Sequence, residues 1–248
     1  MRNRWTTIVI SLAGRAGIMI AGVCALLLVL LGTESSYGQA PDAQAKMAAL
    51  KQSIQTSMAE LRKYEWVENV VVSRKGEEKS RKQNRCYYGA DGKLQKTPIS
   101  QEGGGRKKRG IRGRVAENKK EDMQEYIAEA MGLVKQYVPP DPQKIQAAKE
   151  AGKTSLSVHD NATRMRLTIP DYLKAGDALN VDIDPNNDRL LGVTVSTYLK
   201  NRDDAVTLDA TFGVLTDGTS YPSDIVFEGK SEQIRIVVSN TGYRKSGS

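Results

Sequence analysis

The chain is poor in the residues that most often build catalytic and metal sites. Its 248 residues include a single histidine, His159, and two cysteines, Cys24 and Cys86. Ordinary zinc sites take several His and Cys ligands, so this composition excludes them. Only Cys86 lies beyond the N-terminal segment considered below, which leaves no internal disulfide in the rest of the chain. We expect Cys86 to pack as a small residue within a strand, the alternative being an exposed reactive thiol.

Motifs for nucleophilic catalysis are also missing. His159 lies beside Asp160 where one predicted strand gives way to the next, and nothing in the sequence pattern places a serine beside it. The Gly-x-Ser-x-Gly elbow of many hydrolases does not occur. A Ser-His-Asp triad needs all three side chains in hydrogen-bond contact. We therefore predict a protein that is not an enzyme and takes no cofactor, with His159 as an ordinary turn residue.

A long hydrophobic run occurs only near the N-terminus. Arg2 and Arg4 give this segment a positive start, an apolar stretch covers residues 16–31, and the small residues Ser36 and Gly38 follow. This order is typical of a secretory signal peptide, with cleavage expected after Gly38. The stretch is shorter than the about 20 residues that span a bilayer, although an uncleaved inner-membrane anchor remains the alternative. We expect residues 1–38 to direct export, and residues 39–248 to be periplasmic or secreted.

Residues 39–248 are expected to form a single domain. A helix from Pro41 to about Lys63 has apolar residues at spacings of three and four. A three-stranded meander follows, because the period changes to two and Asp91-Gly92 is a hairpin signal. A second helix ends at Pro139 and Pro140, and a short third helix begins at Asp141. Beyond Thr154 we expect only strands.

Six strands are predicted in this C-terminal part. They cover residues 155–158, 164–169, 179–183, 191–199, 206–212 and 233–238. Short connections make neighbouring strands antiparallel. Each strand has one apolar and one polar face, which indicates a sheet covered on one side. The helices supply that cover, so we predict an α+β fold: a large curved antiparallel sheet, or half-barrel, wrapped around two or three helices.

Positive charge is concentrated in one segment. Without Arg2, Arg4, Arg15 and Glu34 of the signal segment, the 37 basic and 29 acidic residues fall to 34 and 28, a net charge of +6. A glycine-rich basic loop is expected over residues 101–115. Its basic residues are Arg106, Lys107, Lys108, Arg109, Arg112 and Arg114. With no aromatic residue from Gly103 to Val115, single-stranded nucleic acid is an unsuitable partner. The loop is either a solvated surface segment or a contact for anionic lipid head groups.

An acidic segment resembles the start of a calcium loop. Asp182, Asp184, Asn186 and Asp188 occupy alternate positions. The calcium loop requires Gly at its sixth position and Glu at its twelfth, and here those positions hold Asn187 and Val193. We therefore predict a hairpin turn and no metal.

The order of predicted elements resembles that of the LolA/LolB-like lipoprotein carriers. Locally, residues 216–225, Thr-Asp-Gly-Thr-Ser-Tyr-Pro-Ser-Asp-Ile, combine an Asp-Gly turn with Tyr-Pro and precede a last strand that ends at residues 240–243. Residues 172–177 are similar to a sheet turn of that family. The resemblance implies a half-barrel with helices as a lid, enclosing an apolar cavity for acyl chains or a lipidated partner. No position matches a diagnostic ligand-binding motif, so no binding residue is carried over.

Two functions follow as expectations. The first is a non-catalytic periplasmic binding protein for a lipid or a lipidated protein, which the basic loop brings to anionic membranes. The second is a structural or protein-interaction module of the cell envelope with a filled core. Its contacts would use a sheet edge or the polar sheet face, formed by Arg164, Arg166, Thr194, Ser196 and Tyr198.

Overall fold

The computed structural model describes residues 41–102, 111–138, 140–160 and 163–246. The expected signal peptide therefore lies outside the described residues. Three helices are described: α3 (Pro41–Leu61), α4 (Ile111–Val134) and α5 (Pro142–Glu150). The strands are β1 (Tyr64–Arg74), β2 (Glu77–Tyr88), β3 (Leu94–Glu102), β4 (Ser155–His159), β5 (Arg164–Pro170), β6 (Ala178–Asp184), β7 (Arg189–Tyr198), β8 (Ala205–Val214), β9 (Ser220–Gly229) and β10 (Ile234–Lys245).

All ten strands form one antiparallel sheet. The order is β3-β2-β1-β10-β9-β8-β7-β6-β5-β4, so the sheet is open, with β3 and β4 at its edges. Every neighbouring pair is consecutive in sequence except β1 and β10, which pair from Arg74↔Ile234 to Tyr64↔Lys245. This pairing joins the N-terminal meander to the last strand. The predicted α+β class and the large antiparallel sheet are confirmed.

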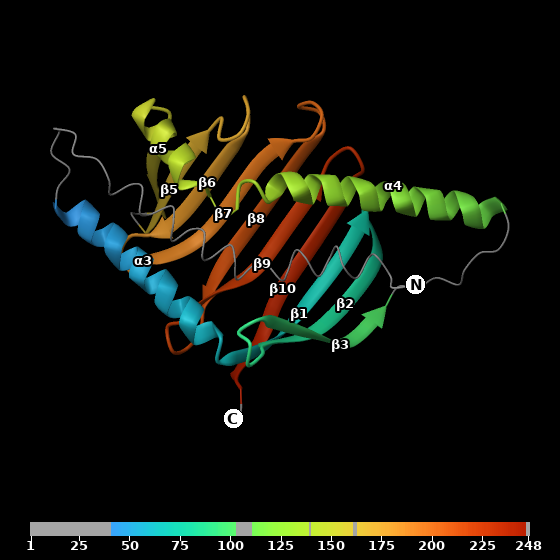
Figure 1. Cartoon of the computed structure of the whole chain (residues 1–248), viewed down its shortest axis with the longest axis horizontal. Helices are drawn as coiled ribbons and strands as arrows, with labels where there is room; N and C mark the ends of the chain where they lie inside the picture. Colours follow the sequence, from blue (N-terminus) through green and yellow to red (C-terminus); the bar gives the residue numbers. More distant parts are fainter. Residues whose placement is uncertain (1–40, 103–110, 139, 161–162, 247–248) are drawn as a thin grey trace.

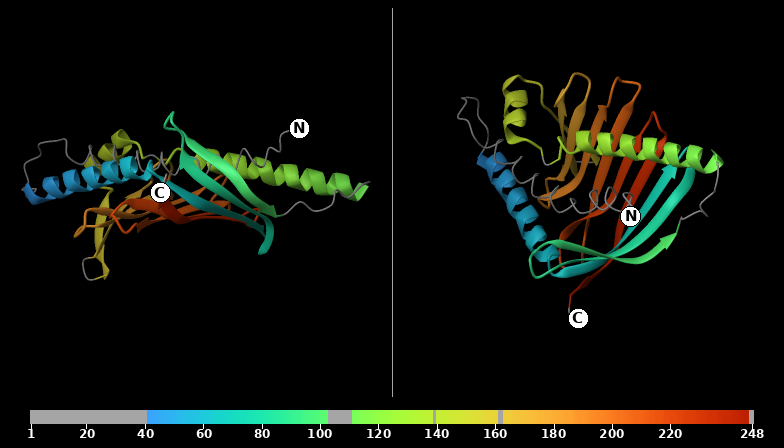
Figure 2. Two further views of the ribbon diagram at one scale, coloured as in Figure 1. Left: turned by 90° about the horizontal axis from the view of Figure 1, so that it is seen from below. Right: turned by 45° about the vertical axis from the view of Figure 1, so that its right-hand side comes forward.

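The helices lie together on the concave face of the curved sheet (Figures 1 and 2). Helix α4 crosses near one end of the strands and α3 runs obliquely near the other end (Figure 1). Helix α3 contacts β7 and β9, and α4 contacts β8. A sheet with one apolar face needs such a cover, as the alternation in the sequence predicted.

The core lies between these helices and the strands from β5 to β10. Phe227, Leu208, Leu179 and Ile169 are 0% exposed, and so is Ile145 of α5. Full burial of a side chain of this size contributes about 1.5–3 kcal/mol of stability. A void large enough for a water molecule would leave part of the surface of these five side chains accessible. Their full burial therefore means that neighbouring side chains fill the space around them.

Helix α4 approaches the sheet closely at a glycine. A Cβ atom on Gly229 of β9 would lie 2.5 Å from Cε1 of Tyr126 on α4. The Tyr126 hydroxyl then donates a hydrogen bond of 2.9 Å to Oδ1 of Asp204, in the turn between β7 and β8. The missing side chain at Gly229 thus makes room for the ring that anchors α4 to the sheet.

Two sequence predictions are corrected. The C-terminal part contains seven strands, because residues 220–229 form β9 instead of a turn leading to the last strand. Pro222 obscured this strand, since proline is rare inside sheets except at bulges. It lies beside one: the β8–β9 register shifts between Thr211 and Phe212. The basic loop is also shorter than predicted, because residues 101–102 belong to β3 and α4 begins at Ile111.

Candidate functional site

The basic residues predicted to touch membranes are only partly described. Arg106, Lys107, Lys108 and Arg109 lie outside the described residues. Arg112 and Arg114 belong to the first turn of α4. Their predicted contact with anionic lipid therefore stays a prediction.

Five aromatic side chains form the most distinctive group on the inner face of the sheet. This aromatic cluster consists of Tyr64, Trp66, Tyr88, Tyr221 and Tyr243. Tyr243 is central: its ring stacks on Trp66 with centroids 5.4 Å apart and planes at 13°, and its centroid lies 4.4 Å from that of Tyr221. Tyr88 lies 5.9 Å from Trp66 on the other side. Such pairs add about 0.5–1.5 kcal/mol each to the burial of the rings.

A β-bulge explains how the cluster assembles. Alternation along β1 places Trp66 on the same face as the buried Val70 and Val72. The β1–β10 register shifts between Glu65 and Val67, and on the opposite strand Gly242 has a φ of +64°. Glycine adopts this backbone conformation without strain. The shift lets Tyr243 turn toward Trp66.

Polar groups beside the cluster are paired. The Trp66 Nε1 donates to Oδ1 of Asn240 at 3.1 Å. Glu68 is buried with its side chain 3% exposed; it accepts hydrogen bonds from Lys96 of β3 and, at 3.0 Å, from Nδ2 of Asn84 on β2. A buried carboxylate is tolerated because these partners replace its water. The Glu68–Lys96 pair ties together three strands.

Burial favours the neutral form of the Cys86 thiol and of the Tyr88 and Tyr243 phenols. Burial, with a smaller contribution from Glu68, raises the pKa of the Cys86 thiol to about 12. Burial also raises the pKa of Tyr88 and that of Tyr243. These groups stay protonated at neutral pH, so the cluster presents uncharged rings instead of a nucleophile or a base. Cys86 is free and 0% exposed, which confirms its predicted place inside a strand.

Helical cover is uneven across the concave face. The main helix–sheet contacts fall on β7, β8 and β9. The cluster lies on β1, β2, β9 and β10, mostly to one side of those contacts, and Trp66, Tyr88, Tyr221 and Tyr243 keep intermediate exposure. The filled interior lies under the helices, whereas the aromatic surface lies at their margin.

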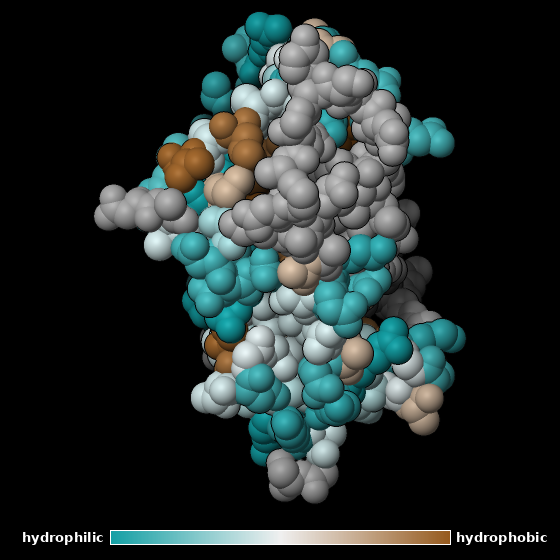
Figure 3. Space-filling view, turned by 90° about the vertical axis from the view of Figure 1, so that its left-hand side faces the viewer, coloured by the Kyte–Doolittle hydropathy of each residue, from teal (hydrophilic) through white to brown (hydrophobic). Residues whose placement is uncertain are grey.

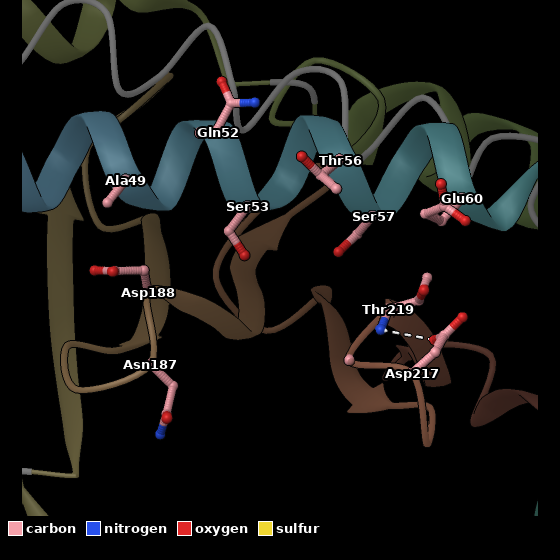
Figure 4. A pocket seen from close by; sticks show the side chains of 11 residues that line it. Ala49, Gln52, Ser53, Thr56, Ser57, Glu60, Asn187, Asp188, Asp217 and Thr219 are labelled. Atoms are coloured by element: carbon pink, nitrogen blue, oxygen red, sulfur yellow. Dashed lines mark hydrogen bonds between the residues drawn. The ribbon is translucent and has the colours of Figure 1, made fainter.

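A polar pocket of about 410 Å³ lies between α3, the β6–β7 turn and the β8–β9 turn. Its lining residues are Ala49, Gln52, Ser53, Thr56, Ser57, Glu60, Asn187, Asp188, Asp217, Gly218 and Thr219. Figure 4 shows Ser53 and Ser57 pointing from α3 toward the turns, whereas Asn187 points away from the helix.

Asp217 connects the pocket to the aromatic cluster. Its Oδ2 accepts a hydrogen bond of 2.5 Å from the Tyr64 hydroxyl, and its Oδ1 accepts one of 3.1 Å from the Thr219 backbone N–H. These bonds lower the pKa of Asp217, with Tyr64 contributing most, and the same bond raises the pKa of Tyr64 to about 12. The carboxylate is therefore ionised and the phenol neutral over the physiological range.

His159 has a serine partner that sequence reasoning missed. Ser157 Oγ lies 2.8 Å from His159 Nε2, because residues two apart on β4 share a face. His159 is exposed and Ser157 is partly exposed, both on the edge strand β4. Among the described residues no carboxylate contacts His159, and the neighbouring Asp160 lies 3.7 Å from Nε of Arg164. The pair lacks the buried third group of a triad.

The acidic segment forms the predicted hairpin turn. Asp184 accepts hydrogen bonds from the backbone N–H of Asn186 at 2.9 Å and of Asn187 at 3.2 Å. Asp182 points away from this turn and makes two hydrogen bonds of 2.7 Å to Arg166. Within the described ranges, no group of three or more His, Cys, Asp and Glu side chains is placed to hold a metal ion. No helix of the described part is long and apolar enough to cross a bilayer.

Sequence reasoning missed both the aromatic cluster and the pocket. The five aromatic residues come from four strands, and the pairing of β1 with β10 brings Trp66 to Tyr243. The pocket joins a helix to two turns that lie far apart in sequence. The available signal was the alternation that puts Trp66 on the same face as Val70 and Val72, which suggests the face but not the contact.

Comparison with known proteins gives similarity at the level of the fold. No family model matches the sequence, and no curated protein does. Solved structures to which the chain is similar include a DUF1329 family protein from Desulfovibrio piger, at 11% identity and a TM-score of 0.37, covering 81% of this chain and 93% of that one. They also include a LolA superfamily protein from Nitrosomonas europaea, at 10% identity and a TM-score of 0.30, covering 78% of this chain and 94% of that one. Both similarities concern the fold and extend over most of each chain.

Proposed function

We propose that this chain is an exported, non-catalytic binding protein that holds the apolar part of a lipid or of a lipidated protein against the aromatic cluster. The supporting observation is the cluster itself, because four of its five residues are only partly buried at the concave face of an open sheet. Uncharged aromatic walls at a concave face are the usual lining of sites for apolar ligands. The LolA-like fold agrees with this function.

The ligand lies at the margin of the helices in this proposal. Side chains such as Phe227 and Leu208 already fill the space beneath α3 and α4. Trp66 and Tyr243 then provide the wall for an acyl chain. The Glu68–Lys96 pair holds β3 to β1 and so fixes the curvature at this end of the sheet.

Fluorescence of Trp66 tests the proposal directly. The chain has two tryptophans, Trp5 and Trp66, and removal of residues 1–38 leaves Trp66 alone. We expect phospholipids brominated along the acyl chain to quench its emission with saturation, and unbrominated lipids to reverse the quenching. Lipid should also be found by mass spectrometry in a fixed ratio to protein purified with its signal intact. Absence of both effects would rule out an apolar ligand at the cluster.

Neighbouring tyrosines on β2 give matched variants for the same titration. Tyr88 belongs to the cluster, whereas Tyr87 is 37% exposed and, one position earlier along the strand, points to the opposite face. Tyr88→Ser should weaken binding of the brominated lipid, because one ring of the wall is lost. Tyr87→Ser should leave binding unchanged. Equal weakening by both substitutions would mean that the lipid binds elsewhere.

The basic segment is proposed to bring the protein to anionic membranes. Six basic residues between positions 106 and 114 concentrate positive charge on a protein that is basic overall. Each basic residue near an anionic surface contributes about 1 kcal/mol of attraction. A protein that exchanges lipid with a membrane gains from such contact.

A second candidate, a protein-interaction module, is favoured by the β4 edge. Leu156 and Val158 are 58% and 60% exposed on this edge strand. Figure 3 shows the corresponding end of the molecule as mainly polar, with small separate apolar patches. Exposed edge strands are sites where another chain can add a strand. This candidate predicts that Leu156→Lys abolishes binding of a protein partner, and that no lipid copurifies.

A further inference from the structure

The polar pocket beneath α3 has the size of a small-molecule site. Its volume is about 410 Å³, within the about 300–1,000 Å³ typical of ligand pockets. Nine of its eleven lining residues have polar or charged side chains, although carbon atoms make up much of the surface that they expose. The proposed apolar site does not use these residues.

Hydrogen-bond acceptors dominate the lining. Glu60, Asp188 and Asp217 contribute three carboxylates, and no Lys, Arg or His lines the pocket. This is unusual on a chain with a net charge of +8. Within the described residues the Asp188 carboxylate has no hydrogen-bond or ion-pair partner, and its backbone φ of +50° holds it at the tip of the β6–β7 turn. The pocket therefore favours a ligand that is cationic and rich in donors.

Two serines extend this polar surface between the carboxylates. Ser57 is 5% exposed, and its Oγ accepts a hydrogen bond of 3.0 Å from the Ser220 backbone N–H. One lone pair and the hydroxyl proton remain for other partners. Ser53 lies one turn earlier on α3 and points into the same space (Figure 4).

The carboxylates are distributed along the pocket. Asp188 lies below the Ala49 and Ser53 part of α3, whereas Glu60 and Asp217 lie at the opposite end (Figure 4). Seven residues of helix, from Ser53 to Glu60, span roughly 10 Å. No group of three such side chains among the described residues could hold one metal ion. The spacing fits an extended ligand with a positive charge at each end.

We propose that this pocket binds a linear oligoamine, with one ammonium group at Asp188 and another at Glu60 and Asp217. The polar middle of the ligand lies along Ser53 and Ser57. This inference does not depend on the apolar ligand of the aromatic cluster.

Existing ion pairs leave the acidic end accessible. Lys63 contacts Glu60 at 2.6 Å with its side chain 62% exposed, and Lys245 lies 3.5 Å from Asp217 with its side chain 55% exposed. Exposed pairs of this kind are weak. A ligand ammonium can replace either lysine without leaving a charge buried.

Calorimetric titration of the purified mature protein with 1,4-diaminobutane and spermidine tests the proposal. We expect saturable binding at low salt, tighter for spermidine because it spans the pocket, and weaker at high salt because charge attraction is screened. The diol 1,4-butanediol, which lacks the charges, should not bind. Magnesium chloride should not compete at equal ionic strength. Absence of amine binding at millimolar concentration, or equal affinity for the diol, overturns the proposal.

Two variants with matched controls locate the site. Asp188→Asn should weaken spermidine binding roughly tenfold, since a charge-assisted hydrogen bond is lost, and asparagine tolerates the positive φ. Its control is Asp203→Asn, an exposed position in the turn at the opposite end of β7. Ser53→Lys should abolish binding by placing an ammonium in the pocket. Its control, Gln55→Lys, changes the charge on an exposed position of α3. Equal effects in a variant and its control overturn the assignment.

Discussion

At the scale of single residues, the Glu68–Lys96 pair is the most demanding feature of the sheet. The side chains of both partners are almost fully buried, 3% and 6% exposed. A buried charge is costly when its partner is removed, because no water can replace it. The pair joins β1 to β3 across β2, with Asn84 of β2 as a third member. The pair and Asn84 therefore hold β1, β2 and β3 together at the curved end of the sheet.

Removal of one member of this pair gives a stability prediction. Lys96→Met should lower the free energy of unfolding by about 3–5 kcal/mol, because Glu68 stays buried without its cation. Urea unfolding followed by Trp66 fluorescence measures the change. Lys79→Met is the control: Lys79 pairs with Glu77 at the exposed start of β2, where the loss should be about 0–1 kcal/mol. Similar losses of unfolding free energy in both variants would show that the buried pair contributes no more to stability than an exposed pair.

Sequence alone could predict the burial of residues but not their partners. Cys86 was expected inside a strand, and it is fully buried there. Glu68 and Lys96 are 28 positions apart on strands that are not neighbours, so local periodicity carries no sign of their contact. The link between Ser157 and His159 was within reach, because alternate residues of a strand share a face.

At the scale of elements, the attachment of α4 depends on one close approach. Tyr126 occupies the space that a side chain at position 229 would fill, and its hydroxyl reaches Asp204. Burial and Asp204 together raise the pKa of Tyr126, so the phenol stays protonated and keeps donating this hydrogen bond.

Two glycine substitutions test this attachment with opposite expected signs. Gly229→Ala should destabilise the protein by about 1–3 kcal/mol, because the new methyl group displaces the Tyr126 ring. Gly132→Ala, on α4, should stabilise by about 0.5–1 kcal/mol, since nothing lies within 4 Å of the new Cβ and alanine favours helix. Thermal unfolding of both variants measures the difference. Stabilisation by Gly229→Ala would show that α4 does not depend on this contact.

Element types were predictable wherever the apolar period was uninterrupted. Helix α3 was expected from Pro41 to about Lys63, and it ends at Leu61. Strand β9 was missed because its bulge breaks the alternation: Pro222, Ile225 and Phe227 are buried, so the spacing changes from three to two. The start of α4 was placed too late, because its first turn is basic and contains Gly113.

At the scale of the whole molecule, the pairing of β1 with β10 decides where a ligand can bind. It converts two separate meanders into one open sheet and brings the rings of β1, β2, β9 and β10 together. Sequence patterns predicted the class of the fold, because each strand shows its apolar face. They could not predict this pairing, since it depends on strands about 170 residues apart, such as Glu68 and Asn240.

Vesicle binding tests how the molecule meets a membrane. Neutralising Arg106, Lys107, Lys108, Arg109, Arg112 and Arg114 to Gln should weaken cosedimentation with anionic vesicles more than tenfold, because two contacts of about 1 kcal/mol each already suffice. The matched control removes the same charge from six exposed lysines: Lys75, Lys79, Lys93, Lys153, Lys200 and Lys230. Neutral phosphatidylcholine vesicles should bind neither variant differently from wild type. If the control loses as much affinity as the first variant, net charge alone governs association, and the basic segment is an ordinary solvated surface.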